Sequence, residues 1–412
     1  MTDALPPGPR DELIAPGDPI YARLAAAARR GLLPGWQPVD FLRGDRLYTR
    51  RELMALLPQP LLPNAQRAPG GGESFLVLGN APRAFAAGRD WQVQATKAGV
   101  TAAELSTHWR GWAFSAGRRS LRWGPGWTGG LLFSDTAPPL DRISVTKNFG
   151  RLTFEQFYGQ FFEPDDPTAP PEARGTRRHL AGRRLTLHSN GPWELSAGEA
   201  IKALRLPDPF FATTLPWYVY EHDWTSGGTG RWLGLPRSAS YKSSHWLNYM
   251  GELSVSYHPK NGPHLYGEYL LDDIKAPAFL GGSETTPQRS GLLIGAAATR
   301  GPLSWRAELL DTNRRTYRSD IQADTWQRGD SLLGHAGGPN ARLLFARTDY
   351  KVSPRLALAL EAEQRRRRDT SQLGPTDLNR VTLFASATLS PQAFTTTRLE
   401  RDSARLTLGW IL

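Results

Sequence analysis

The chain contains 412 residues, which is enough for two or three ordinary domains or for one large barrel. Its formal net charge of +11 predicts an anionic partner, and nucleic acid, an anionic membrane face and an acidic polysaccharide fit that charge equally well. The absence of cysteine excludes disulfides and cysteine-based metal or nucleophile sites, and the absence of any run of about eighteen apolar residues argues against a transmembrane helix.

The amino-terminal region contains two helix signals between segments rich in proline and glycine. Residues 1–17 are expected to form an extended or disordered tail. Asp18 and Pro19 signal the start of one helix, and the capping-box sequence Thr49-Arg50-Arg51-Glu52 opens a second. We therefore predict a helical segment over 18–66, which a linker rich in proline and glycine joins to the rest of the chain.

From about residue 74 to Leu412, period-2 alternation replaces the helical pattern, as in the run from Glu252 to His258. Tight-turn sequences occur at Phe149-Gly150, Asn190-Gly191, Lys260-Asn261-Gly262, Arg300-Gly301-Pro302, Lys351-Val352-Ser353-Pro354 and Ser390-Pro391. Longer polar connections lie between them, near 163–177, 203–246, 275–286, 314–339 and 367–375. An outer-membrane barrel has short periplasmic turns and long external loops, so this order favours one barrel over 74–412 rather than a sandwich.

The number of strands can be estimated from the same pattern. About sixteen strands are visible, each near the length that a tilted strand needs to cross a bilayer. Any further strands are expected within 203–246 or 84–117, where the alternation is poor. The last strand is expected to descend to Leu412, which places the C-terminus on the periplasmic side.

One segment contains a distinctive motif in addition to the alternating pattern. Arg122-Trp123-Gly124-Pro125-Gly126-Trp127 forces a backbone reversal between two indoles, and such a motif alone is typical of a structural corner. It is followed by Leu131-Leu132-Phe133-Ser134 and then by Ala137-Pro138-Pro139-Leu140. Together these residues resemble the core signature of the Wzi-like capsule assembly proteins, a family of outer-membrane β-barrel lectins.

The resemblance implies a fold and an organisation. We expect an all-β fold, a large antiparallel transmembrane β-barrel of about 16–18 strands, with a short N-terminal α-helical segment. In the family, helices of this kind lie on the periplasmic side, so residues 18–57 are expected to act as a periplasmic cap or plug. These residues also show partial similarity to an S-layer-homology repeat, which implies a contact with peptidoglycan or other periplasmic envelope components.

A second segment, Leu265 to Asp273, also resembles the family, in which such a strand ends in paired acids. Adjacent residues of a strand point to opposite faces, so Asp272 and Asp273 cannot form an acid/base dyad in one cleft. We expect them to pair with arginines of the lumen rather than to take part in catalysis. No metal or cofactor is expected.

Two groups of residues at the predicted external end are candidates for polysaccharide binding. Guanidinium groups bind carboxylates through bidentate hydrogen bonds, which makes candidates of Arg314, Arg315, Arg318, Arg365, Arg366, Arg367 and Arg368. Aromatic faces stack on sugar rings, which adds Trp217, Tyr218, Tyr220 and Trp224. The competing interpretation is that the arginines solvate the rim and that the aromatic residues form loop core or interface girdle.

The predicted function is that of a non-enzymatic protein of the cell outer membrane, which binds, anchors or helps to assemble an acidic surface polysaccharide and contacts outer-membrane lipid. A secretory signal peptide is not visible at Met1, so export implies a leader that is missing from this sequence. One alternative is an anion-selective, porin-like channel. Another is an outer-membrane lipid or glycan hydrolase using residues such as Ser256 and His258. No nucleic-acid motif accompanies the positive charge.

Overall fold

The computed structural model describes residues 12–14, 19–29, 33, 36, 40–41, 48–56, 73–78, 83–87, 91–96, 99–162, 177–203, 248–272, 289–318, 325–353, 355–367, 377–390, 393–401 and 403–411. Within them, eighteen strands form one antiparallel sheet. The strands are β1 (Glu73–Leu78), β2 (Arg83–Ala87), β3 (Trp91–Thr96), β4 (Gly99–Trp109), β5 (Trp112–Arg119), β6 (Leu140–Phe149), β7 (Leu152–Phe162), β8 (Arg177–His188), β9 (Trp193–Ala203), β10 (Asn248–Tyr257), β11 (His264–Asp272), β12 (Ser290–Arg300), β13 (Leu303–Thr312), β16 (Ala341–Ser353), β17 (Leu356–Arg367), β18 (Leu378–Ser390), β19 (Ala393–Glu400) and β20 (Ser403–Ile411).

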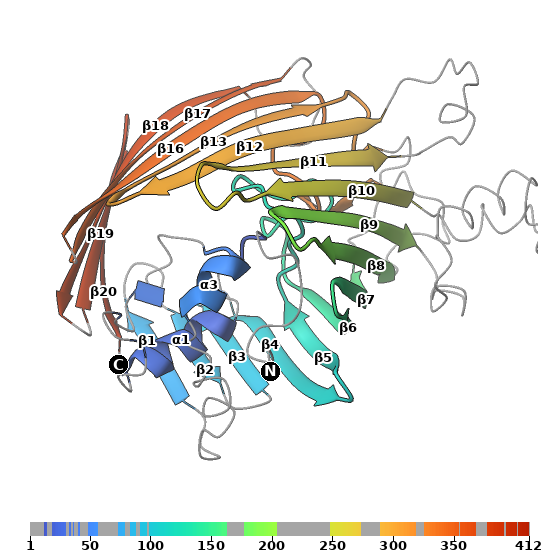
Figure 1. Ribbon diagram of the computed structural model, residues 1–412, viewed down its shortest axis with the longest axis horizontal. Coiled ribbons are helices and arrows are strands. Elements are labelled where there is room, and N and C mark those ends of the chain that lie inside the picture. Colours follow the sequence, from blue (N-terminus) through green and yellow to red (C-terminus); the bar gives the residue numbers. More distant parts are fainter. Residues whose placement is uncertain are drawn as a thin grey trace, which may run out of the picture.

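The sheet closes on itself. Each strand pairs with the next along the chain, β13 pairs with β16, and β20 returns to β1 through Val77 opposite Ile411 and Leu78 opposite Trp410. A barrel leaves no sheet edge unpaired, as a bilayer requires. The predicted all-β barrel is therefore confirmed, with eighteen strands in the described part (Figure 1). Strands β2 to β4 lie largely in the region 84–117, where the sequence pattern was weak.

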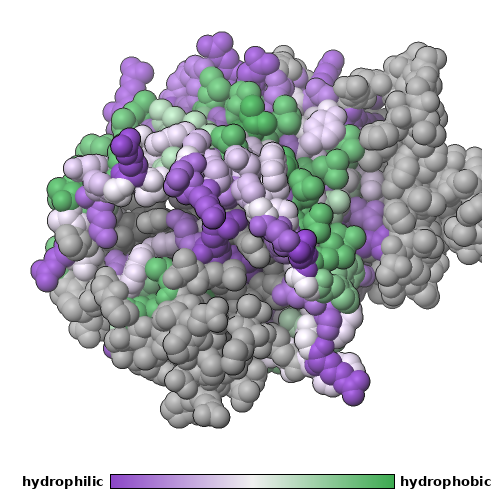
Figure 2. Space-filling view, in the orientation of Figure 1, coloured by the Kyte–Doolittle hydropathy of each residue, from purple (hydrophilic) through white to green (hydrophobic). Residues whose placement is uncertain are grey.

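The two faces of the wall follow the alternation. On β17, Glu361 and Glu363 are buried on the lumen side, whereas Leu358 and Leu360 are exposed on the outside. Figure 2 shows hydrophobic side chains gathered over the strands at the top of the view. Large aromatic side chains are exposed close to the short turns, at Trp109, Phe149, Trp193, Trp305 and Tyr350. This arrangement is typical of a lipid-facing band with an aromatic girdle.

The connections divide the barrel into two ends. At one end consecutive strands are joined by the predicted tight turns, such as those between β6 and β7 and between β12 and β13. At the other end lie the long connections, of which 120–139 and 313–340 are largely described. Strand β1 begins and β20 finishes at the short-turn end, as Figure 1 shows for the C-terminus. In outer-membrane barrels the short-turn end is periplasmic.

The N-terminal segment contains α1 (Pro19–Arg29) and α3 (Arg50–Leu56), within the predicted range 18–66. The capping box forms as predicted, because the Glu52 amide donates to Thr49 Oγ1 at 3.1 Å and the Thr49 amide donates to Glu52 at 2.7 Å. The segment has its own small apolar core, made by Ile14, Ile20, Tyr21, Leu24, Ala25, Ala28, Leu33, Phe41, Tyr48 and Leu53. Among the described residues, no helix has the length and apolar character needed to cross a bilayer.

The larger apolar core lies inside the barrel. It joins wall residues such as Phe157, Leu270 and Leu310 to residues of the two long connections 120–139 and 313–340. A barrel with the lipid outside has no other place for a protein core, so these connections fold inward. We call the two connections together the lumen plug. The hairpin of β14 (Gln327–Arg328) and β15 (Ser331–Leu332) is part of it.

Candidate functional site

The first half of the plug is the Arg-Trp-Gly-Pro-Gly-Trp corner. Trp123 is 1% exposed, and its ring meets Phe133 edge to face at 4.9 Å and Phe157 of the wall at 5.7 Å. Arg122 donates to the Asp135 carboxylate and to the carbonyl oxygen of Gly126. The guanidinium therefore closes the reversal that the two glycines and the proline begin.

Two glutamates of the wall hold this corner in the lumen. Glu268 accepts the Gly126 amide at 2.9 Å and the Leu131 amide at 2.7 Å. Glu308 accepts the amide and hydroxyl of Thr128 at 2.9 and 2.7 Å. The backbone approaches the wall closely, because a Cβ built on Gly124 would lie 2.2 Å from Glu268 Oε1. Only glycine fits there, and its φ of +101° is one that other residues rarely adopt.

The second half of the plug, 313–340, docks on the first. Tyr317 Oη donates to the Leu131 carbonyl at 2.6 Å, and Trp326 Nε1 donates to the Leu132 carbonyl at 2.9 Å. Lys202 of the wall is 1% exposed and donates through Nζ to two carbonyls of this connection, both at 2.9 Å. The two connections therefore form one body that the wall grips by hydrogen bonds.

Asp272 contributes to the same docking. Its carboxylate accepts the Tyr317 amide at 2.6 Å and so caps the turn that starts the 313–340 connection. The pairing with arginines of the lumen that the sequence predicts for Asp272 stays a prediction beside this backbone contact. Asp273 lies outside the described residues.

His335 joins the two connections of the plug by hydrogen bonds. Its Nδ1 accepts the Gly337 amide at 2.9 Å, so Nε2 carries the proton and faces Thr128 Oγ1, also at 2.9 Å. Burial, together with the positive charges of Arg365 and Arg122, lowers the pKa of His335 to about 3. The side chain is therefore a neutral hydrogen-bonding group at neutral pH.

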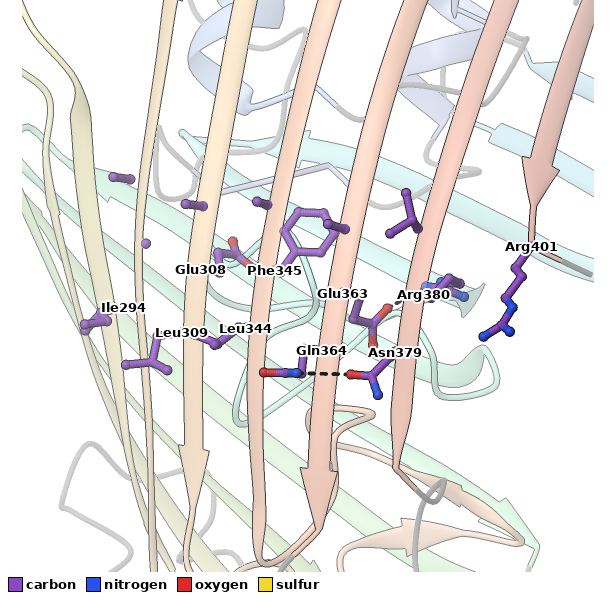
Figure 3. A pocket seen from close by; sticks show the side chains of 16 residues that line it. Ile294, Glu308, Leu309, Leu344, Phe345, Glu363, Gln364, Asn379, Arg380 and Arg401 are labelled. Carbon is purple, nitrogen blue, oxygen red and sulfur yellow. Dashed lines mark hydrogen bonds and ion pairs between the residues drawn. The ribbon is translucent and has the colours of Figure 1, made fainter.

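A ladder of charged residues lines the lumen face of β16, β17 and β18. Arg347 donates to Glu361 at 3.2 Å, while Glu363 accepts from Arg365 at 2.6 Å and from Arg380 at 2.5 Å. Arg347 also pairs with Asp349 at 2.8 Å, so its charge is matched by two carboxylates, whereas Arg365 and Arg380 share Glu363. We call the three arginines, with Glu361 and Glu363, the arginine ladder. Figure 3 shows Glu363 and Arg380 pointing toward one another across neighbouring strands.

Part of the arginine ladder has unused hydrogen-bonding capacity. Nε and Nη1 of Arg365 and Nε of Arg380 are buried, and no hydrogen-bond partner for them occurs in the described part of the chain. An unpaired buried donor costs about 1–3 kcal/mol. A carboxylate or another anion would satisfy these donors, and a guanidinium presents them in a planar fork that suits a carboxylate. The chemistry available here is anion binding.

The predicted binding residues fall into three groups. Arg365 belongs to the ladder and Arg367 continues the same face of β17, whereas Arg366 is exposed on the outer face. Strand alternation therefore divides the predicted run of arginines between lumen and lipid. Arg314 and Arg315 are exposed in the turn after β13, and Arg318 is half-buried there. The remaining candidates lie outside the described residues: Trp217, Tyr218, Tyr220, Trp224 and Arg368.

Sequence reasoning missed several residues of this site, including Glu268, Glu308, His335, Lys202 and Arg380. For β17 a signal was present, because period 2 places Glu361, Glu363 and Arg365 on one face. For the others no local signal exists, since Gly126 and Glu268 are 142 positions apart in the chain.

The N-terminal segment reaches the same wall from the short-turn end. Glu12 accepts both Nη groups of Arg184 of β8 at 3.1 Å, and Arg50 lies 3.6 Å from it. Burial raises the pKa of Glu12 above its ordinary value, while the two arginines oppose that shift. Arg184 also donates to Glu155 at 2.7 Å and lies over the ring of Trp123, 4.8 Å from its centroid. Arg184 thus touches both the N-terminal segment and the plug.

Comparisons with known proteins identify the fold. No family model and no curated protein matches the sequence. Among solved structures, the chain is similar to Wzi of Escherichia coli, described as an outer-membrane protein involved in group 1 capsule assembly and as a carbohydrate-binding β-barrel. The identity is 12% and the TM-score 0.59, over 97% of this chain and 99% of that chain. OccK10 (OpdN) of Pseudomonas aeruginosa matches at 10% identity and TM-score 0.46, over 83% and 97% of the two chains.

At sequence identities of 12% and 10%, the similarity to these structures shows the fold alone. The expected resemblance to Wzi is confirmed at that level, over nearly the whole of both chains. The structure is that of an outer-membrane β-barrel protein, which agrees with the predicted location in the cell outer membrane.

Proposed function

We propose that this protein binds an acidic surface polysaccharide at the lumen side of its long-connection end and thereby anchors or helps to assemble it. The observation that carries the proposal is Arg365, whose Nε and Nη1 are buried without a hydrogen-bond partner among the described residues. A uronic-acid carboxylate supplies two acceptor oxygens in the geometry that a guanidinium prefers.

The surroundings of Arg365 favour an anion. Glu363 engages only one of its nitrogens, and His335, which Arg365 influences electrostatically, stays neutral because of its lowered pKa. Arg314 and Arg315 are exposed where the 313–340 connection begins, so they are suited to a first contact with a charged chain. The predicted aromatic residues of 217–224 remain part of the proposal as stacking surfaces.

The plug supports binding over conduction. Its core packs against the lumen side of β7 to β13 and β16, so a polysaccharide arriving from the long-connection end meets packed side chains there. Binding at such a mouth needs no bond-breaking step and no cofactor, and we propose a non-enzymatic role. The N-terminal segment, at the opposite end, is suited to a periplasmic cap.

Binding of two polymers of matched length tests this proposal. Polygalacturonate carries a carboxylate on each sugar, whereas dextran carries none. The purified protein should bind polygalacturonate and not dextran, and Arg365→Gln with Arg380→Gln should weaken binding about tenfold or more, since a charge-assisted hydrogen bond contributes about 1.5–3 kcal/mol. Arg300→Gln, at an exposed arginine beside a short turn, is the matched control and should bind normally. Equal binding of both polymers, or of all variants, would refute the site.

A further inference from the structure

The outer surface of the barrel carries a hollow of about 910 Å³ across β12, β13, β16, β17 and β18. Figure 3 shows this hollow, with Ile294, Leu309, Leu344, Gln364 and Asn379 along it. Most of its lining residues belong to the outward-facing set of their strands, so the hollow opens toward the lipid and not toward the lumen. We call it the outer-wall hollow.

The floor of the hollow is a row of alanines. Ala296 lies opposite Ala307, Ala307 opposite Ala346, and Ala346 opposite Ala362, so four neighbouring strands present a methyl group at the same level. The next row toward the long-connection end is larger, with Ile294, Leu309 and Leu344 in register. A trough one residue wide therefore crosses the wall, with an apolar floor and with Ile294, Leu309 and Leu344 along one side. Its dimensions and chemistry suit a hydrocarbon chain.

The end of the hollow nearest the long connections is polar. Gln364 Nε2 donates to Asn379 at 3.1 Å, and one step farther along the same face Arg342 lies directly opposite Arg366. Directly opposed like charges destabilise a sheet, because their Cβ atoms are about 5 Å apart. Arg342 is bound to Asp311 at 2.8 Å, whereas Arg366 forms no ion pair with any described residue.

A third arginine reaches the hollow from the adjacent turn. Arg401 lies between β19 and β20, lines the hollow, and forms no ion pair with any described residue. Figure 3 shows its side chain extending toward the hollow. Arg342 and Arg366 thus lie one row beyond the polar end of the trough, near the carboxylates of Asp311 and Asp377, and Arg401 lines the trough itself. The facing pair Arg342 and Arg366 is complementary to a phosphate.

We propose that the outer-wall hollow binds a phosphorylated glycolipid of the outer leaflet, with an acyl chain in the alanine trough and a phosphate at the facing pair Arg342 and Arg366. The outward direction of these arginines separates this site from the arginine ladder in the lumen. A second copy of the chain is a poorer occupant, since a two-fold contact would bring the same arginine pair against itself.

Native mass spectrometry of the detergent-purified protein with lipid A as the probe tests this proposal. Lipid A should be retained more strongly than its dephosphorylated form or phosphatidylethanolamine. The double variant R342Q/R366Q should retain at least fivefold less lipid A, and so should Ala346→Leu, which fills the trough. The matched controls are Arg300→Gln for charge and Ala385→Leu for volume, since Ala385 faces outward on β18 but lies outside the hollow. Both controls should retain lipid A normally, and thermal unfolding should be unchanged in all four.

Three results would overturn the proposal. The first is equal retention of lipid A by all variants. In the second, inorganic phosphate displaces lipid A completely while Ala346→Leu behaves as the parent, which would leave a phosphate site without an acyl chain. In the third, Ala346→Leu changes a monomer–dimer equilibrium in the absence of lipid, which would assign the trough to a second copy. Polygalacturonate binding is measured separately, so failure here leaves the lumen site untouched.

Discussion

Replacing one glycine should release the lumen plug. In Gly124→Ala the new Cβ would lie 2.2 Å from Glu268 Oε1, so the carboxylate must move away from the two amides that it accepts. Loss of both hydrogen bonds leaves the buried amides of Gly126 and Leu131 unpaired, which costs about 3 kcal/mol, and alanine at a φ of +101° adds about 1 kcal/mol of strain. Together these terms reduce docking of the plug by about 4 kcal/mol, or about a thousandfold.

Single-channel conductance in planar bilayers measures this release. The parent protein should be silent, and Gly124→Ala should show openings that close again as the plug redocks. Gly150→Ala is the matched control, because Gly150 also has a positive φ of +68° but its Cβ would meet nothing within 4 Å. It shares the backbone strain without the displacement of Glu268, and it should stay silent. Openings of equal frequency in both variants, or in neither, would refute the role assigned to Glu268.

Three further predictions concern the same structure. Lys202→Met should leave two carbonyls of the 313–340 connection without their donor and weaken docking by about 1–3 kcal/mol, which limited proteolysis of that connection would detect. The pKa of His335 is lowered from 6.5 to about 3, so the docked plug loses about 1.4 kcal/mol for each pH unit between 6.5 and 3 and is unaffected above 6.5. Openings should therefore increase as the pH falls through that range, and His335→Gln should remove the dependence. Deletion of residues 1–66 should give steady conductance through the barrel, because the N-terminal segment no longer covers its short-turn end. A silent deletion variant would show that the plug alone closes the lumen.

The barrel was predictable because its signals are local. In a strand every second side chain faces the lipid, so apolar residues at alternate positions reveal the strand. The turn sequences mark the places where the chain reverses. The run from Leu356 to Arg367 shows both the success and its limit. Its alternation predicts a strand, and the run of arginines at its end predicts one binding cluster. The same alternation, however, directs Arg365 into the lumen and Arg366 to the lipid, so the run is not one cluster.

The plug was not predictable, because its contacts join distant parts of the chain. The corner at 122–127 is recognisable as a reversal, but its partner Glu308 lies 180 positions beyond Thr128. In the segment 265–273 the sequence singles out the terminal acids Asp272 and Asp273. In the structure, Glu268 in the middle of the strand accepts hydrogen bonds from two backbone amides of the plug. Local patterns show that a polar residue faces the lumen, but they contain no information about which loop folds back to meet it.

The shared contacts of Arg184 lead to a last prediction, that docking of the plug and docking of the N-terminal segment are coupled. The plug packs on the walls of β7 to β13 and β16, whereas α1 lies against β2, so the two contact different parts of the barrel. Arg184 joins them, since it binds Glu12 of the N-terminal segment and lies over Trp123 of the plug.

A double-mutant cycle on open probability, with Glu12→Gln and Gly124→Ala, tests this coupling. If Arg184 transmits an effect, the free-energy changes of the two substitutions should differ from additivity by about 0.5–3 kcal/mol, as for residues in one network. Strict additivity would show that the N-terminal segment and the plug dock independently. In that case polysaccharide bound at the long-connection end would have no route, through Arg184, to the periplasmic side.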